Sequence, residues 1–256
     1  MADDQYTRLA AEHLPEELAE RWTALLRPCI RLRPAKADEQ NVAATLGGNP
    51  ELPAGYAWPE WPERGPLSFV ASVNCAALPS EGLSEHFPQD GTLLFFYYDA
   101  FIAESQVLYV AENTPVSPAD PPQGVEIFMR VDLVGKVEQS APDNWLPEVR
   151  RVLLGDDRAW PHPRDTPQEL KPFLRAFARQ RTEIGHQIGG HAMPIQGPVE
   201  HEIAKDDAES WVLLAQIDSD EDAEMSWGDT GALYWLIRAE DLAARRFDQV
   251  RTTIQC

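Results

Sequence analysis

The sequence has no long apolar run, few cysteines and a shortage of basic residues, and each shortage disfavours a class of protein. No apolar stretch approaches the roughly 20 residues of a membrane-spanning helix. The N-terminal stretch MADDQYTRLAAEHL lacks the apolar centre of a secretory signal, so we expect a cytoplasmic protein. Cys29, Cys75 and Cys256 are widely spaced and form no CxxC pair, which is typical of reduced thiols.

Signatures of catalysis and cofactor binding are missing as well. The sequence contains no GxSxG nucleophile motif, no P-loop and no GxGxxG dinucleotide motif. We therefore expect no cofactor and name no catalytic residue. A protein that is not an enzyme is the interpretation that these absences favour.

Acidic residues greatly outnumber basic ones, and they are concentrated in one stretch. The net charge is −20, which disfavours nucleic acid and anionic membranes as partners because both bind positive surfaces. Residues 200–229 contain eleven acids and a single base, Lys205, so they carry half of the excess charge. This concentration favours a basic protein or peptide as the partner.

Hydrophobic periodicity predicts a mixture of helices and short strands. After Pro15, an amphipathic stripe of apolar residues indicates a helix that Pro28 ends. Thr166, Pro167 and Glu169 form a capping-box pattern at the start of a second helix, which we expect to reach 181. A short helix is expected at 240–247. Apolar runs predict strands at 67–78, 92–98, 106–111, 125–137 with a break at Gly135, 211–217, 232–237 and 252–254.

Two parts of the chain share one order of motifs. In the first part Gly-Gly is followed by SFVASVN and then GTLLFFYY; in the second, Gly-Gly is followed by VLLAQID and then GALYWLIR. The corresponding segments lie 140 to 144 residues apart. Two sheet-rich units that cannot bury their faces alone can share one core. We therefore expect an α+β, β-rich fold in which internally duplicated, mostly antiparallel sheet units form one domain with flanking helices.

This organisation sets the expected boundaries. A single domain covers residues 1–256, with a helical segment at 1–28. The repeat units lie at about 42–137 and 184–256.

The ordered motifs also resemble a known family. The chain is similar to the bacterial YwqG-like family through GGNPELPAGYAWPEW, PLSFVASVN, GTLLFFYYD, HQIGG and WVLLAQIDSDEDAEMSWGDTGALYWLI. The resemblance covers the chain from about residue 30 and implies an α+β, duplicated, sheet-rich domain of unknown function. It extends distantly to eukaryotic ribosome-biogenesis proteins that chaperone a ribosomal protein. Where the family has Ala-Gln-Ile, the first unit has Ser72 in place of glutamine, while the second unit keeps Gln216.

The acidic turn of the second unit is the first candidate site. Its acids form a patch for a basic partner: Asp218, Asp220, Glu221, Asp222 and Glu224. The spacing also imitates a calcium loop, but Ala223 stands where such a loop needs glycine and strands flank it, so we expect no metal. Trp227-Gly228-Asp229 is expected to form a tight turn with positive φ.

The remaining candidates support a polar or aromatic binding surface. Trp58 and Trp61 lie in a proline-rich loop and either anchor it or contact a peptide. The histidines have no zinc spacing. The candidate binding residues are Trp58, Trp61, His186, Gln187, Gln196, Trp227 and Asp229.

Two hypotheses about function follow. We favour a non-enzymatic protein-interaction module that binds a basic peptide or protein in a chaperone-like or toxin-neutralising role. The alternative is an enzyme or small-ligand binder with a polar site between the two repeat units, built from His186, Gln187, Gln196 and Asp229.

Overall fold

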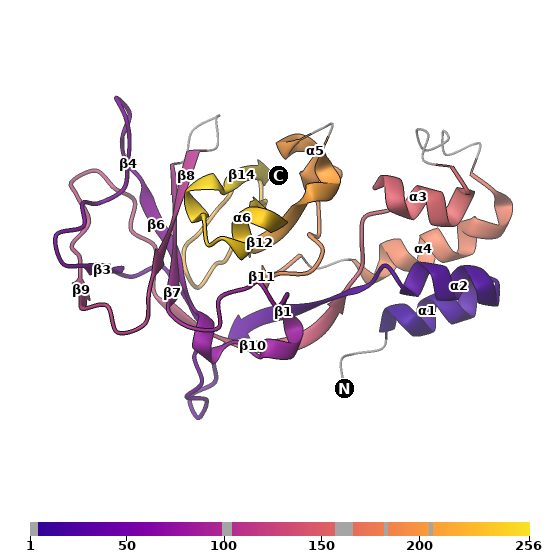
Figure 1. Cartoon of the computed structure of the whole chain (residues 1–256), viewed down its shortest axis with the longest axis horizontal. Coiled ribbons are helices and arrows are strands. Elements are labelled where there is room, and N and C mark those ends of the chain that lie inside the picture. The colour runs from indigo at the N-terminus through magenta and orange to yellow at the C-terminus, as the bar shows by residue number, and fades with distance from the viewer. Residues whose placement is uncertain (1–4, 99–103, 157–165, 182–183, 205–206) are drawn as a thin grey trace.

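Antiparallel strands form the body of the fold, and four helices gather at one end of it (Figure 1). The computed structural model describes residues 5–98, 104–156, 166–181, 184–204 and 207–256. The helices in these residues are α1 (Gln5–His13), α2 (Glu16–Thr23), α3 (Pro147–Leu154), α4 (Lys171–Gln180), α5 (Val199–Ile203) and α6 (Ala239–Ala243). None of these helices is long and apolar enough to cross a membrane.

The strands build one large sheet and two small ribbons. The large sheet holds β1 (Arg27–Pro34), β2 (Ala44–Leu46), β6 (Ser68–Asn74), β7 (Thr92–Tyr98), β8 (Glu104–Val110), β10 (Val131–Ser140), β11 (Gln187–Ile188), β12 (Trp211–Asp218), β13 (Ala232–Arg238) and β14 (Arg251–Gln255). The ribbons pair β3 (Glu51–Pro53) with β9 (Val116–Pro118), and β4 (Glu60–Trp61) with β5 (Gly65–Pro66).

The large sheet curls until its two outer strands nearly meet. Its order is β14-β13-β12-β11-β1-β10-β2-β6-β7-β8, and every neighbouring pair is antiparallel. A hydrogen bond between the Ser105 and Thr252 hydroxyls joins β8 to β14 at the seam. The molecule is therefore a nearly closed antiparallel sheet with a few helices.

The two halves of the sheet place corresponding residues in corresponding positions. We call β2-β6-β7-β8 the first half-sheet and β11-β12-β13-β14 the second half-sheet; β10 and β1 lie between them. The register of β6 on β7 shifts just before Ala71, and that of β12 on β13 shifts just before Ala215. Gly91 and Gly231 precede β7 and β13, and a Cβ at either would press on the last carbonyl of the outer strand, that of Val110 or of Gln255.

The main core lies on the concave side of the sheet, between the two halves. Phe95 of the first half-sheet packs edge-on against Trp235 of the second, with ring centroids 5.2 Å apart. Because β7 and β13 are buried on both faces, they read as continuous apolar runs in the sequence. Their other faces pack under the loops outside each half-sheet.

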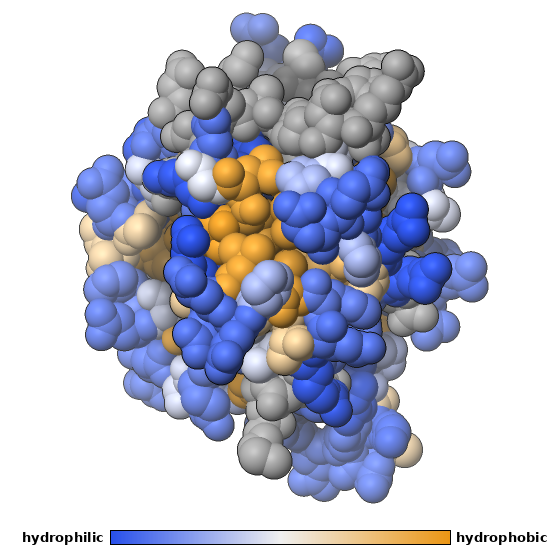
Figure 2. Space-filling model, turned by 90° about the vertical axis from the view of Figure 1, so that its right-hand side faces the viewer, coloured by the Kyte–Doolittle hydropathy of each residue, from blue (hydrophilic) through white to orange (hydrophobic). Residues whose placement is uncertain are grey.

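A second core holds the helices together. Trp22 of α2 is fully buried and lies edge-on to Phe173 and Phe177 of α4, with Tyr6 of α1 beside them. Figure 2 shows apolar surface at this end of the molecule. The partly buried apolar residues packed against this core are Leu18, Leu25, Leu26, Val152, Leu154, Leu174 and Ala176.

Each of the seven predicted ranges contains a strand, although the one expected at 125–137 begins only at Val131. Three further details of the secondary-structure prediction are wrong. β10 runs unbroken through Gly135, where the missing side chain admits Ile30 of β1; a Cβ there would lie 2.7 Å from Ile30 Cγ2. The capping box does not form: α4 begins only at Lys171, no side chain caps it, and Pro172 occupies its first turn. A strand, β1, begins at Arg27, within the segment predicted to be helical.

Candidate functional site

The acidic turn is a tight hairpin whose apolar residues enter the core. Asp220 and Met225 exchange two backbone hydrogen bonds of 2.9 Å across it. Ala223, Met225 and Trp227 are buried, and the Trp227 indole donates to the Asp218 carbonyl at 3.2 Å. Gly228 and Thr230 have positive φ, which confirms the predicted tight turn. These contacts fix the hairpin against the sheet and hold its tip in water.

The hairpin divides the five acids of the predicted patch into two groups. The Asp218 carboxylate accepts backbone hydrogen bonds from Gly185 and Ser219, each at 2.9 Å. The Asp220 carboxylate accepts from the Ala223 amide at 2.7 Å and from His186 Nε2 at 3.1 Å, and the hydrogen bond from His186 lowers the pKa of Asp220. These two acids hold the loops together, whereas Glu221, Asp222 and Glu224 are exposed.

Two exposed apolar side chains lie beside the exposed acids. The amide of Met129 donates to the Ala223 carbonyl at 2.9 Å, so residues 127–129 run along the hairpin. Phe128 points inward against Trp227, while Ile127 and Met129 are 59% and 54% exposed. Apolar side chains next to charged ones are typical of protein contact surfaces. We define the acidic hairpin surface as Ile127, Met129, Glu221, Asp222 and Glu224.

The two tryptophans of the proline-rich loop cover the outer face of the first half-sheet. Trp58 Nε1 donates to the Leu67 carbonyl at 2.8 Å, and its ring lies edge-on to Phe96. Trp61 lies edge-on to Tyr98, and the Arg64 guanidinium stacks on its ring. Both side chains are half-buried, so the loop is anchored while one part of each ring stays in contact with water.

The structure does not bring the four polar candidates of the second repeat unit into one site. His186 is buried, and its Nδ1 accepts a hydrogen bond from the Asp218 amide at 3.1 Å. Its Nε2 therefore carries the hydrogen and donates to Asp220. Gln187 is also buried and donates to backbone carbonyls of Gly189 and His191. Gln196 and Asp229 are exposed on separate loops, and Gln196 bonds the Cys256 carbonyl.

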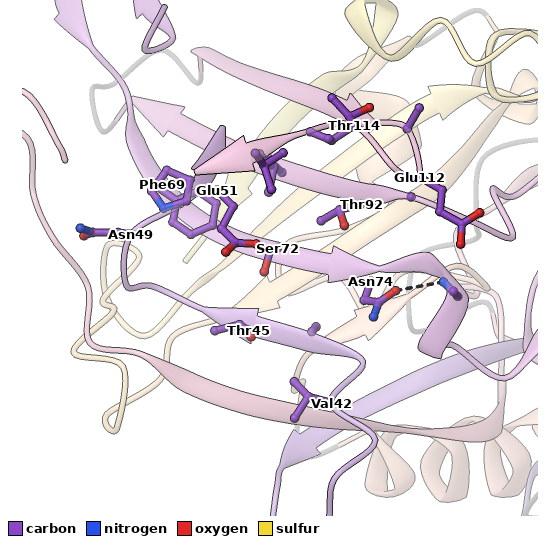
Figure 3. A pocket seen from close by; sticks show the side chains of 18 of the residues that line it. Val42, Thr45, Asn49, Glu51, Phe69, Ser72, Asn74, Thr92, Glu112 and Thr114 are labelled. Carbon is purple, nitrogen blue, oxygen red and sulfur yellow. Dashed lines mark hydrogen bonds between the residues drawn. The ribbon is translucent and has the colours of Figure 1, made fainter. Parts of the chain in front are cut away.

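A cleft that the sequence did not predict as a site lies on the outer face of the first half-sheet (Figure 3). Its volume is about 640 Å³. Thr45, Ser72, Asn74 and Thr92 project from the strands into it, and Glu51 stands on its wall. Residues 111–114 form the facing wall. The only sequence signal for this cleft was Ser72, which replaces the glutamine of the family pattern.

Several polar groups in the cleft are free to meet a ligand. Among the described residues, nothing hydrogen-bonds or ion-pairs with the side chains of Ser72, Thr92, Glu51 or Glu112. Arg130, the one basic residue among the described residues of the lining, is paired with Asp132 at 2.9 Å. The cleft therefore presents hydroxyl groups on its floor and uncompensated negative charge on its walls.

A small cavity near α5 is lined by the carboxyl group of Glu200. Burial, together with the charges of Glu148 and Asp143, raises the pKa of Glu200 to about 7. His191 lines the same cavity, and burial lowers its pKa to about 3. Arg27 is the basic residue of the lining. Folding therefore favours the protonated carboxyl of Glu200 and the neutral imidazole of His191.

We expect the free energy of unfolding of the wild type to fall as the pH rises, and we expect Glu200→Gln to lack the part of this fall that Glu200 causes. A carboxyl whose folded pKa lies above its unfolded value stabilises the fold below about pH 4.5, and this contribution is lost as the pH rises through about 7. The loss should be about 2 kcal/mol, because part of the side chain still meets water. Urea unfolding of both proteins between those pH values measures it. Exposed Glu12→Gln is the control, and equal slopes for wild type and Glu200→Gln would contradict the prediction.

Within the described part of the chain, no group of three or more histidine, cysteine, aspartate and glutamate side chains is arranged to hold a metal ion. The three cysteines are free thiols, with Cys29 and Cys75 buried.

Comparison with known proteins assigns the family. A family model described as a domain of unknown function (DUF1963) matches residues 44–256. The match covers most of the sequence, so the chain belongs to the DUF1963 family. The comparison with curated proteins gave no match. The acidic hairpin surface and, apart from Val42, the lining of the cleft lie inside the matched residues, whereas α1, α2 and β1 precede them.

Proposed function

We propose that this protein is a non-enzymatic protein-interaction module that binds a basic protein or peptide through the acidic hairpin surface. The observation that carries the proposal is the exposed pair Ile127 and Met129 beside three exposed carboxylates on a hydrogen-bonded hairpin. A contact surface with an apolar centre and a charged rim combines affinity with selection of the oppositely charged partner. The partner that fits carries apolar side chains next to lysine or arginine.

The charge of the whole chain supports the same partner. At a net charge of −20, long-range attraction speeds the approach of basic molecules and disfavours acidic ones. A chaperone-like or toxin-neutralising role would use such a surface to cover a basic client. The distant resemblance to chaperones of a ribosomal protein agrees with this role.

Affinity purification from a cell extract tests the proposal. We expect immobilised wild-type protein to retain basic proteins at low salt and to release them at about 0.5 M salt, where charges are screened within a few ångströms. The triple variant Glu221→Gln, Asp222→Asn, Glu224→Gln should lose this retention.

The matched control removes the same number of charges elsewhere. Glu16, Glu17 and Glu20 are exposed on α2, and their replacement by glutamine should leave the retention unchanged. If only neutral or acidic proteins are retained, or if both triple variants behave alike, the proposal is wrong. Met129→Ser then separates the apolar contribution from the charge, because it removes the centre of the surface and no acid.

We further propose that the chain is YwqG-like, that its two halves arose by internal duplication, and that it works in the cytoplasm. The matching register shifts before Ala71 and Ala215 and the matching glycines, Gly91 and Gly231, support duplication. Free buried thiols are typical of a reducing compartment.

A further inference from the structure

The outer face of the second half-sheet carries a segment of the chain itself. Residues 191–197 cross this face after Gly190, and side chains of the sheet bind their backbone. Gln216 accepts from the Met193 amide at 2.9 Å, Tyr234 donates to the Met193 carbonyl at 2.8 Å, and Gln187 donates to the His191 carbonyl at 2.8 Å. Gln255 accepts from the amides of residues 195 and 196 and donates to the carbonyl of residue 197. Four side chains of the sheet thus hold a covering segment through hydrogen bonds to its backbone.

The first half-sheet has a counterpart for each of the four residues that bond this segment, which are Gln187, Gln216, Tyr234 and Gln255. Gln187 pairs with Gln216 in the sheet as Thr45 pairs with Ser72. Gln216 pairs with Tyr234 as Ser72 pairs with Leu94. Gln255 ends the outer strand of its half as Val110 ends the other. All four counterparts line the cleft: Thr45, Ser72, Leu94 and Val110.

The cleft therefore occupies the position on the first half-sheet that residues 191–197 cover on the second half-sheet. Serine and threonine extend less far from the sheet than glutamine, so a segment bonded to them must lie closer to the strands than residues 191–197 do in the other half. Leucine and valine cannot hydrogen-bond such a segment. The residues after Gly48 instead join the β3–β9 ribbon at the side, and about 640 Å³ stays open above Ser72.

We propose that this cleft binds an extended segment of another polypeptide that carries a lysine or arginine side chain. The floor offers the Ser72 and Thr92 hydroxyls and the Asn74 side-chain amide to the backbone of the segment (Figure 3). Extended peptides are commonly held through such backbone hydrogen bonds, while pockets at the sides select their side chains. Val116, 39% exposed on the wall, adds an apolar contact.

The charge of the walls decides which peptide fits. Glu51 and Glu112 have no partner among the described residues, and Arg130 is already paired. A lysine or arginine of the bound segment can pair with either glutamate, whereas an acidic segment would meet uncompensated like charge. The inference does not depend on the acidic hairpin surface, because no residue is shared between the two.

Selection from a library of random linear peptides, each as long as the segment 191–197, tests the inference. The full-length protein is immobilised, and enriched peptides are synthesised and titrated against it and its variants. We expect a lysine or arginine at a fixed position of the enriched peptides. Ser72→Gln should weaken them at least about tenfold, because glutamine fills the space as Gln216 does in the other half. Glu51→Gln and Glu112→Gln should each weaken them about threefold.

Three variants make the result specific. Exposed Ser84→Gln adds the same side chain outside the cleft and should not change the affinity. The acidic hairpin triple variant should bind these peptides as the wild type does, so the two proposals fail separately. Ser72→Thr keeps the hydroxyl with little added volume and should retain most of the affinity. The inference is overturned if no peptide is enriched, if enriched peptides lack a basic residue, or if Ser72→Gln binds them undiminished.

Discussion

Replacing Trp227 by alanine is expected to lower the free energy of unfolding by about 4 kcal/mol, the largest effect of a single substitution that we predict. Trp227 is 2% exposed and lies edge-on to Tyr97 and Phe128, with ring centroids 5.8 and 5.3 Å apart. Alanine leaves a cavity between the first half-sheet and the hairpin, and the Asp218 carbonyl loses its indole donor. Both changes act in the folded state only.

Urea unfolding followed by circular dichroism measures this effect without relying on the lost indole. Trp145 is 50% exposed, so Trp145→Ala should change the free energy of unfolding by less than about 1 kcal/mol. A similar loss in the two variants would show that Trp227 does not join the hairpin to the core. We also expect Trp227→Ala to weaken binding at the acidic hairpin surface, because Phe128 lies between Ile127 and Met129.

Replacing Gly47 by alanine should cost about 3 kcal/mol, the second largest effect. Gly47 has a φ of +54°, and a Cβ there would lie 2.6 Å from the Phe128 carbonyl oxygen. A side chain in the left-handed region costs about 1–2 kcal/mol, and displacing backbone atoms of the neighbouring segment adds a similar amount.

Gly55 gives a matched control for the backbone contribution alone. Its φ is +77°, yet a Cβ there meets nothing within 4 Å. Gly55→Ala should therefore cost about 1 kcal/mol. Thermal unfolding of both variants gives the loss of stability in each, and the difference between the two losses is the contribution of the close contact. Equal losses would exclude a steric role for Gly47.

The strands that could be predicted are those whose burial shows in a few consecutive residues of the sequence. β7 and β13 are buried on both faces, so each reads as an unbroken apolar run with a glycine before it. The tight hairpin after β12 was visible because glycine and aspartate favour its geometry. In each case a few adjacent residues carry the whole signal.

β1 escaped prediction because its partners are remote. Arg27 pairs with Ser140, and Arg31 pairs with Gln187. Pro28, which is typical of the end of a helix, is instead the second residue of this strand. Nothing within the eight residues of β1 indicates that it lies between the two halves of the sheet.

The candidate sites divide in the same way. The exposed acids at 221, 222 and 224 follow from composition, whereas the structural use of Asp218 and Asp220 depends on amides of Gly185 and Ala223 that only the fold brings close. The cleft left almost no sequence signal, since it arises from an absence: within the described ranges, no segment covers Ser72 as residues 191–197 cover Gln216.

The central position of β1 also sets the order in which the sheet can form. β1 lies near the N-terminus, yet its neighbours are β10 and β11, so no sheet partner exists for it until residue 131 has been synthesised. The first half-sheet can assemble earlier from β2, β6, β7 and β8, because its antiparallel neighbours are close in the chain. Pairings between remote strands slow folding by raising the contact order. During synthesis on the ribosome, β1 therefore stays unpaired at first, and Ile30 and Leu32, which are buried in the folded protein, stay exposed. The joining of the two halves is the late step.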